Sequence, residues 1–116
     1  AYFQKNRGKV NKAIDTYQRI LKLTKNDSSM YPTLRKKVLM NLADLYYSIG
    51  DYKKACKFYL EAIKNYPQSR EFTWFLYQAG NCYRHLGSSE EAKRFYAILR
   101  EKFPQDLWTK LSLVML

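Results

Sequence analysis

An internal repeat constrains this sequence more than any other feature. Residues 50–59 recur as residues 87–96, with Gly, Ala, Phe and Tyr at matching places 37 positions apart. Pro67 and Pro104 keep the same spacing. Self-similarity at a period of a few tens of residues is typical of arrays built from one stacked supersecondary unit.

A third, less complete copy lies upstream. Gly8, Ala13 and Tyr17 match the glycine, alanine and tyrosine of the second copy at a spacing of 42. The five extra residues fall in the polar stretch 26–30, which we interpret as a lengthened loop.

Within each unit the apolar residues follow a helical period. Leu39, Leu42, Ala43 and Tyr46 recur at i, i+3, i+4 and i+7, which favours an amphipathic helix. The same spacing runs through the residues that follow Gly50. We expect helices over 9–24, 33–49, 52–65, 70–86, 89–102 and 106–116, with a helical stub before Gly8.

Punctuating residues predict where these helices begin and end. Gly50 and Gly87 stand where a first helix would end in a left-handed residue. Pro67 and Pro104 indicate the ends of the second helices. The Ser-Ser-Glu-Glu sequence at 88–91 fits a capping box for the helix that follows.

Each unit is therefore predicted to be an antiparallel helix pair. One pair cannot bury its apolar face alone, so the pairs must stack on one another. Ala55 and Ala92 are small because two helices are expected to approach closely there. The fold class that follows is all-α: a solenoid of antiparallel helix pairs.

These residues resemble the tetratricopeptide repeat (TPR) family. The second unit supplies Leu39, Leu42, Ala43, Tyr46, Gly50, Tyr52, Ala55, Tyr59, Ala62 and Pro67 of its pattern. The third supplies Leu76, Ala79, Gly80, Tyr83, Gly87, Ala92, Tyr96, Leu99 and Pro104. The resemblance implies a right-handed superhelical solenoid. It also implies one array with a clipped first repeat at 1–31, repeats at 32–68 and 69–105, and the start of a fourth repeat or a capping helix at 106–116.

The length of the unit and the ends of the chain add expectations about context. Units longer than the family's usual repeat look like those of bacterial cell-envelope members, so the periplasm or cell envelope is one candidate compartment and the cytoplasm is the other. The chain starts without an initiator Met and stops inside an apolar stretch. We therefore expect it to be a piece of a longer protein.

The same resemblance implies a binding function on the inner wall formed by the first helix of each pair. A protein or peptide partner, of acidic character in one version of the hypothesis, is expected to meet that wall. The predicted partner-binding residues are Lys37, Met40, Asn41, Asp44, Tyr47, Trp74, Tyr77, Gln78, Asn81 and Arg84. Their aromatic, amide and basic side chains suit an extended segment.

An excess of basic residues supports an alternative. Lys and Arg number 21 against 10 Asp and Glu, a formal charge of +11, and many of them fall on the predicted second helices. Nucleic acid or another anionic surface would fit such a face. The competing interpretation is a solvated surface that contacts nothing.

The sequence shows no pattern of catalytic chemistry. We find no glycine-rich phosphate loop and no cofactor motif, and a single histidine excludes a metal site of several His. Cys82 and His85 are one helical turn apart, but the repeat pattern places one inside and the other at the rim. Cys56 and Cys82 are expected to be buried thiols, with a disulfide left open. A spacer or oligomerisation segment of an enzyme remains a third hypothesis.

Overall fold

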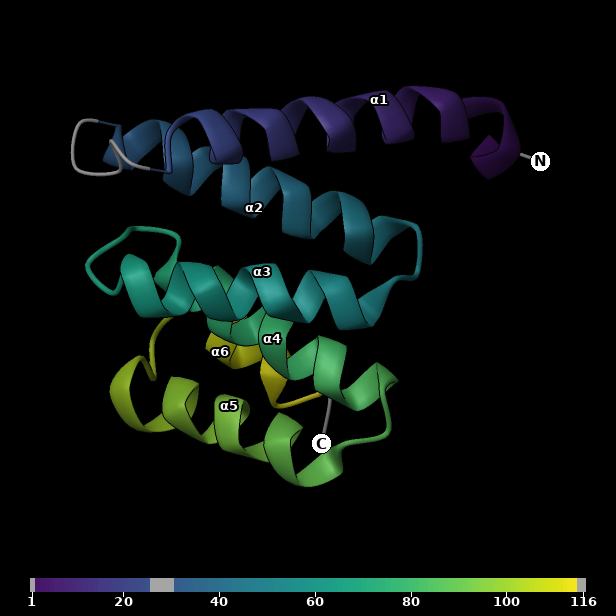
Figure 1. Ribbon diagram of the computed structural model, residues 1–116. Coiled ribbons are helices and arrows are strands. Elements are labelled where there is room, and N and C mark those ends of the chain that lie inside the picture. The colour runs from purple at the N-terminus through teal and green to yellow at the C-terminus, as the bar shows by residue number, and fades with distance from the viewer. Residues whose placement is uncertain (1, 26–30, 115–116) are drawn as a thin grey trace.

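The computed structural model describes residues 2–25 and 31–114, and all regular structure in this part of the chain is helical (Figure 1). The helices are α1 (Tyr2–Leu23), α2 (Pro32–Ser48), α3 (Tyr52–Asn65), α4 (Phe72–His85), α5 (Ser89–Lys102) and α6 (Leu107–Ser112). The predicted all-α architecture is confirmed. Within the described ranges, none of the helices is long and apolar enough to cross a membrane.

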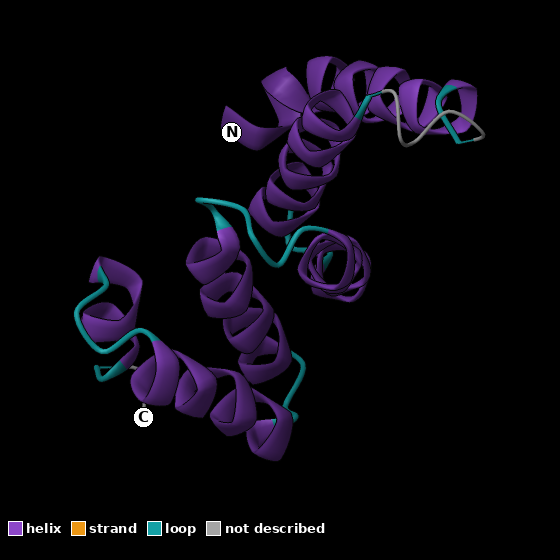
Figure 2. Ribbon diagram, turned by 90° about the vertical axis from the view of Figure 1, so that its left-hand side faces the viewer, coloured by secondary structure: helices purple, strands orange, loops and turns teal. Residues whose placement is uncertain are grey.

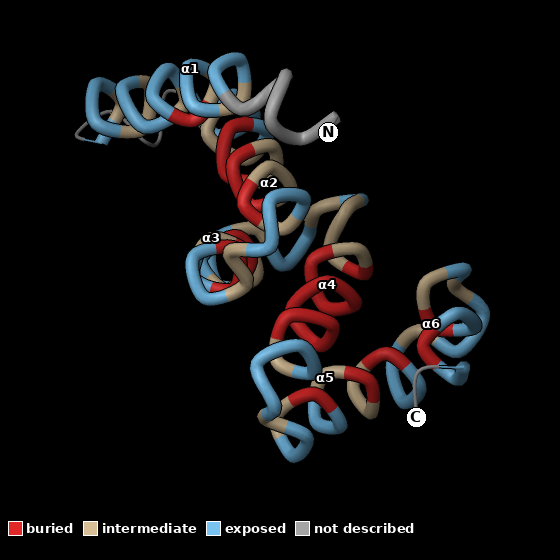
Figure 3. Tube along the Cα trace, turned by 90° about the vertical axis from the view of Figure 1, so that its right-hand side faces the viewer, coloured by how far each residue is buried: buried red, intermediate tan, exposed pale blue. Residues whose placement is uncertain are grey.

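Each helix packs against the one that follows it, and the chain reverses at every loop. Figures 2 and 3 show α1 and α3 on one side of the stack and α4 and α6 on the other. The array measures 40 × 37 × 21 Å. These sequential helix pairs are the arrangement that the repeat predicts.

The turns between α2 and α3 and between α4 and α5 are built alike. Gly50 and Gly87 adopt φ values of 82° and 81°, in the left-handed region that suits glycine. After Gly50, the amide of Asp51 donates to the carbonyl of Tyr46 at 2.9 Å, and the corresponding bond after Gly87 measures 2.8 Å. The predicted glycine stops are confirmed.

The first helix departs from the prediction. Helix α1 is continuous from Tyr2 to Leu23, so Gly8 lies inside it and does not end a stub. A glycine permits a left-handed turn without requiring one, and it costs an interior helical position only about 1 kcal/mol relative to alanine. Val10, Ile14 and Leu21, which follow the glycine, pack against the central core.

The capping box predicted at 88–91 is wrong. Ser88 is the N-cap residue of α5, but its side chain makes no capping hydrogen bond. Glu91 instead forms an ion pair with Arg94 at 3.6 Å, one turn further along the helix. Asp51 and Asp106 carry the caps that do form, since their carboxylates accept backbone N–H bonds at the starts of α3 and α6.

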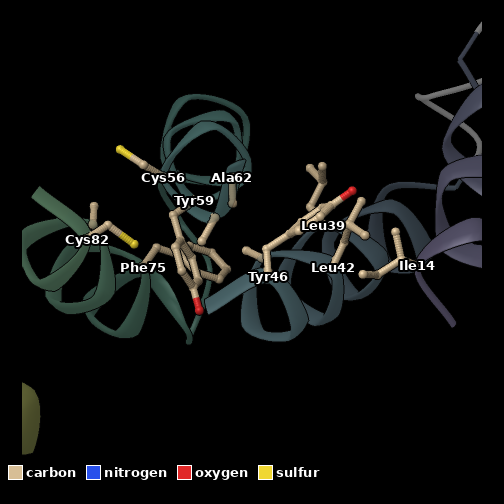
Figure 4. Close-up of a cluster of buried hydrophobic side chains, with 12 residues drawn as sticks. Ile14, Leu39, Leu42, Tyr46, Cys56, Tyr59, Ala62, Phe75 and Cys82 are labelled. Carbon is tan, nitrogen blue, oxygen red and sulfur yellow. The ribbon is translucent and has the colours of Figure 1, made fainter. Parts of the chain in front are cut away.

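The core is centred on α4. Most of this helix is buried from Thr73 to Cys82, because α3 covers one side and α5 and α6 cover others (Figure 3). Figure 4 shows side chains from α1 to α4 meeting in one cluster. Ala55 and Ala92 are buried, as expected of positions where helices approach closely.

Candidate functional site

The ten predicted partner-binding residues all lie on α2 and α4, but at different depths. Lys37 and Arg84 are exposed. Half-buried positions are occupied by Met40, Asn41, Asp44, Tyr47 and Trp74. Three others, Tyr77, Gln78 and Asn81, are 7%, 6% and 3% exposed and so lie inside the molecule.

Asp44 joins the two helices of the predicted wall. Its Oδ1 atom accepts a hydrogen bond from Trp74 Nε1 at 3.2 Å, across the gap from α4 to α2. The hydroxyl of Tyr59, on α3, donates to the same oxygen. Burial raises the pKa of Asp44 above its usual range, and the two donors oppose that shift by favouring the charged carboxylate.

The polar chain continues from Tyr59 through α4 to α5. Gln78 Nε2 donates to the Tyr59 hydroxyl at 3.4 Å, and Asn81 Nδ2 donates to Gln78 Oε1 at 2.9 Å. Tyr96, on α5, donates to Asn81 Oδ1 at 2.5 Å. Each polar group in this sequence has a partner, so the network satisfies itself and ties four helices together.

This network repeats with the units. In two units, a tyrosine of the second helix donates to a polar residue of the first helix, and the two polar residues are 37 positions apart. Tyr59 on α3 donates to Asp44 on α2, and Tyr96 on α5 donates to Asn81 on α4. The amide of the next first helix donates to the preceding tyrosine, as Gln78 does to Tyr59. Asn41 Nδ2 approaches Tyr17 in the same way, at 3.5 Å. Asn41 and Gln78 therefore face neighbouring helices in the stack.

Helix α6 covers the far end of the predicted wall. The ring of Trp108 lies 4.5 Å from that of Trp74 and stacks on Tyr77 at 5.3 Å, between ring centroids. Asp106 holds this contact in place, because its Oδ2 accepts from Thr73 on α4 at 3.0 Å while its Oδ1 caps α6. No signal in the repeat alignment singled out Trp108 or Asp106 for this role.

A rim of aromatic rings closes the other end, where α2, α3 and α4 meet. Tyr52 and His85 stack with ring centroids 4.1 Å apart and planes within 5°. Tyr47 packs edge-on against both rings, at 5.1 and 5.8 Å. Desolvation, and then the charge of Arg84, lower the pKa of His85, while burial raises the pKa of Tyr47 to about 12.

The two cysteines are buried and free. Burial raises the pKa of Cys56 and raises that of Cys82 to about 12, so neither thiol is an activated nucleophile at neutral pH. Across the described ranges, no three His, Cys, Asp or Glu side chains gather in a group that could hold a metal ion.

A cleft lies away from the predicted wall, between the start of α2 and the loop after α3. Its lining includes Thr33, Lys36, Tyr66 and Pro67. Lys36 is already paired with Glu71 at 3.1 Å, across the mouth of that loop. None of the ten predicted residues lines this cleft.

Comparison with known proteins shows the family to which the chain is similar. The sequence model of the RNPP family C-terminal domain matches residues 1–103. Among curated proteins, outer dynein arm-docking complex subunit 4 of Xenopus laevis is 26% identical over 92 residues, which cover 79% of this chain and 17% of that protein. The chain thus spans about a sixth of the length of this relative. The expected likeness to TPR proteins is confirmed at the level of a TPR-like helical array.

Proposed function

We propose that this chain, which belongs to the family of RNPP C-terminal domains, is a non-enzymatic scaffold that binds a peptide or protein segment along α2 and α4. The observation that carries the proposal is the fixed row of half-exposed side chains on these two helices. Trp74 and Asp44 join its two helices by a hydrogen bond. Exposed aromatic surface beside satisfied polar groups is the composition of binding hot spots.

The proposed contact set is smaller than the ten residues that sequence analysis selects. It consists of Lys37, Met40, Asn41, Asp44, Tyr47, Trp74 and Arg84, whose side chains are exposed or half-buried. We propose that the three buried residues support the contact set without touching the partner, because each is hydrogen-bonded or stacked against its neighbours. They are Tyr77, Gln78 and Asn81.

The chemistry of the row defines the partner by class. Lys37 lies near the start of α2 and Arg84 near the end of α4, and both suit carboxylates, while Met40 and Trp74 offer apolar surface. We therefore propose an extended segment that carries both apolar and acidic side chains. The hydrogen-bonded frame keeps the row in one geometry, which lowers the ordering entropy lost on binding.

A selection from a randomised peptide library provides the test. Peptides enriched on this chain are titrated against it and against Trp74→Ala. We expect Trp74→Ala to weaken binding by roughly 30-fold, which corresponds to about 2 kcal/mol. Because Trp74 also bonds Asp44 and packs on Trp108, Trp74→Phe is measured beside it, and circular dichroism checks that helicity is kept.

Tyr31→Ala is the matched control, because Tyr31 is an exposed aromatic residue that precedes α2 and lies outside the row. Its affinity for the selected peptide should match that of the parent chain. Equal affinities for the parent and for Trp74→Ala would remove the row from the site, and enrichment of no peptide would count against a peptide-binding scaffold.

Two wider expectations stay predictions. The long repeat unit resembles those of bacterial cell-envelope proteins, which predicts the periplasm or cell envelope as the compartment. The matched family does not test that prediction. A spacer role within an enzyme is tested differently, by deleting this segment from the full-length protein. Activity that survives the deletion would favour the spacer hypothesis over a binding scaffold.

A further inference from the structure

We propose that the outer face of α1 and α3 binds the phosphate backbone of a nucleic-acid duplex without reading its sequence. This surface is distinct from the row on α2 and α4, so the inference goes beyond the proposed function. We call it the basic face and define it by its exposed lysines. They are Lys9, Lys12, Lys22, Lys53, Lys54, Lys57 and Lys64.

The imbalance of charge is concentrated on these two helices. Together α1 and α3 contain ten Lys and Arg but only two carboxylates, Asp15 and Glu61. Asp15 is committed to Arg19 in an ion pair at 3.3 Å. The lysines of the basic face are all exposed, and Figures 2 and 3 show the two helices on the same side of the stack.

Helix α5 is less basic than α1 and α3. It carries Glu90, Glu91 and Glu101 among its four basic residues, so its outer surface is close to neutral. Net charge alone does not require this distribution. The excess of Lys and Arg over Asp and Glu is therefore greater on α1 and α3 than on α5.

The chemistry of the basic face favours phosphates over an acidic protein. Stable protein interfaces rest on a desolvated centre of aromatic and apolar anchors. Among the described residues of α1 and α3, the only large apolar side chain that is strongly exposed is Leu23, at the end of α1. Binding by counterion release needs no such anchors, and flexible lysines suffice for it.

The duplex is favoured over a single strand and over a membrane. Single strands are held by bases stacked on aromatic rings, whereas the described aromatic side chains of α1 and α3 are all at least half-buried, Tyr17 and Tyr59 among them. A membrane-surface helix inserts its apolar face, but that face of α1 packs on α2 through Ile14. Lys9 and Lys22 span about 20 Å of α1, enough to follow several phosphates.

Fluorescence anisotropy with two duplexes of unrelated sequence tests the proposal. Both should bind with the same affinity, and the affinity should fall by roughly 100-fold between about 50 and 200 mM salt if about four phosphates are contacted. A strong preference for one sequence, tighter binding of a single strand of the same length, or little dependence on salt would overturn it.

Two charge-reversed variants locate the contact. Lys12→Glu with Lys53→Glu changes the basic face, and Lys93→Glu with Lys102→Glu makes the same change of net charge on α5. The first should weaken duplex binding by roughly tenfold or more and reduce the salt slope by about 2. The second should have little effect, because charges more than about 10 Å away are screened at 0.1 M salt.

Equal losses in both variants would show that diffuse charge is responsible and would overturn the assignment to α1 and α3. Binding to phosphatidylserine vesicles without binding to duplexes would overturn the choice of ligand. A selected peptide should bind the Lys12→Glu, Lys53→Glu variant as it binds the parent chain. Failure of the basic face is thereby distinguished from failure of the row.

Discussion

At the scale of single residues, tyrosine hydroxyls connect the repeats. Tyr59 donates to Asp44 in its own unit and accepts from Gln78 in the next, while its ring is fully buried. Burial is the main cause that raises its pKa, so the hydroxyl stays protonated and available as a donor. Each such tyrosine therefore contributes a packing surface and a polar link between helices.

Tyr59→Phe should destabilise the chain by about 1–3 kcal/mol, since Asp44 and Gln78 each lose one of their two hydrogen bonds. Tyr17→Phe is the matched control. Tyr17 is half-buried and its hydroxyl makes only a long contact with Asn41, so we expect a loss below about 0.5 kcal/mol. Urea denaturation measures both, and equal losses would contradict a structural role for the network.

Asp44 should make stability depend on pH. Burial raises the pKa of this carboxyl in the fold, so the native state holds its proton more tightly than the unfolded chain does. The cost of charging it is absent below the ordinary aspartate pKa of about 3.9 and fully present once pH exceeds the raised value.

Asp44→Asn removes this charge while keeping an oxygen for Tyr59 and Trp74, as Asn81 does for Tyr96 in the next unit. We expect the variant to be more stable than the parent at about pH 7 and to lose that advantage toward about pH 3. The free energy of unfolding, measured at both pH values, decides. An advantage of the same size at both would contradict the assigned cause.

Which of these residues serve the stack could be predicted from the repeat itself. Asn41 and Gln78 are 37 positions apart, so both repeats have an amide side chain at this place. At the same spacing, Tyr47 of one repeat corresponds to Arg84 of the next. A side chain that every unit needs for packing recurs, and one that serves a particular ligand does not have to. All ten predicted residues share one helix face, and position on that face alone does not separate the buried residues from the exposed ones.

At the scale of the helices, two glycines in helical positions have opposite roles. A Cβ at Gly80 would lie 2.6 Å from the ring of Tyr96, which is buried and anchored to Asn81. A Cβ at Gly8 would meet nothing within 4 Å. Gly80 thus permits the close approach of α4 and α5, while Gly8 contributes no packing.

Gly80→Ala should therefore cost about 1–3 kcal/mol through overpacking, although alanine is the better helix former. Gly8→Ala should add about 0.5–1 kcal/mol of stability, because it improves helix propensity at an open position. Thermal or urea unfolding gives both values. A change of the same sign in the two variants would contradict the packing of Tyr96 against α4.

Helix α6 depends on one carboxylate. Asp106→Ala should remove both the cap of α6 and its bond to Thr73, at a cost of about 1–2 kcal/mol. Trp108 would then leave Trp74 and Tyr77, so tryptophan emission should shift to the red. Unchanged emission, with the same accessibility to a soluble quencher, would show that α6 docks by other contacts.

Helix identity was easier to predict than helix ends. Apolar periodicity and the glycine stops placed four of the helices, α2 to α5, to within two residues at each end, because both signals are local. The continuous path of α1 through Gly8 and the missing Ser88 cap depend on packing and on competing partners such as Arg94. The spacing of apolar residues and glycines along the sequence does not determine such contacts between side chains.

At the scale of the whole molecule, the two long sides of the array carry different chemistry. One side presents the row of aromatic, amide and basic groups on α2 and α4, and the other presents the basic face of α1 and α3. The buried tyrosine network links α2, α3, α4 and α5 by hydrogen bonds. Fold and core were predictable from the repeat, whereas the division into two surfaces depends on how deeply each polar residue is buried.

The central claim is that a partner segment lies along α2 and α4, and an NMR titration tests it most directly. The chain contains two tryptophans, so the indole N–H signal of Trp74 can be followed beside that of Trp108. With a selected peptide, we expect shifts for Trp74 and for the amides of Lys37, Asp44 and Arg84, while the outer amides of α3 and α5 stay in place. Shifts confined to α3 or α5, with the Trp74 signal unmoved, would contradict the account.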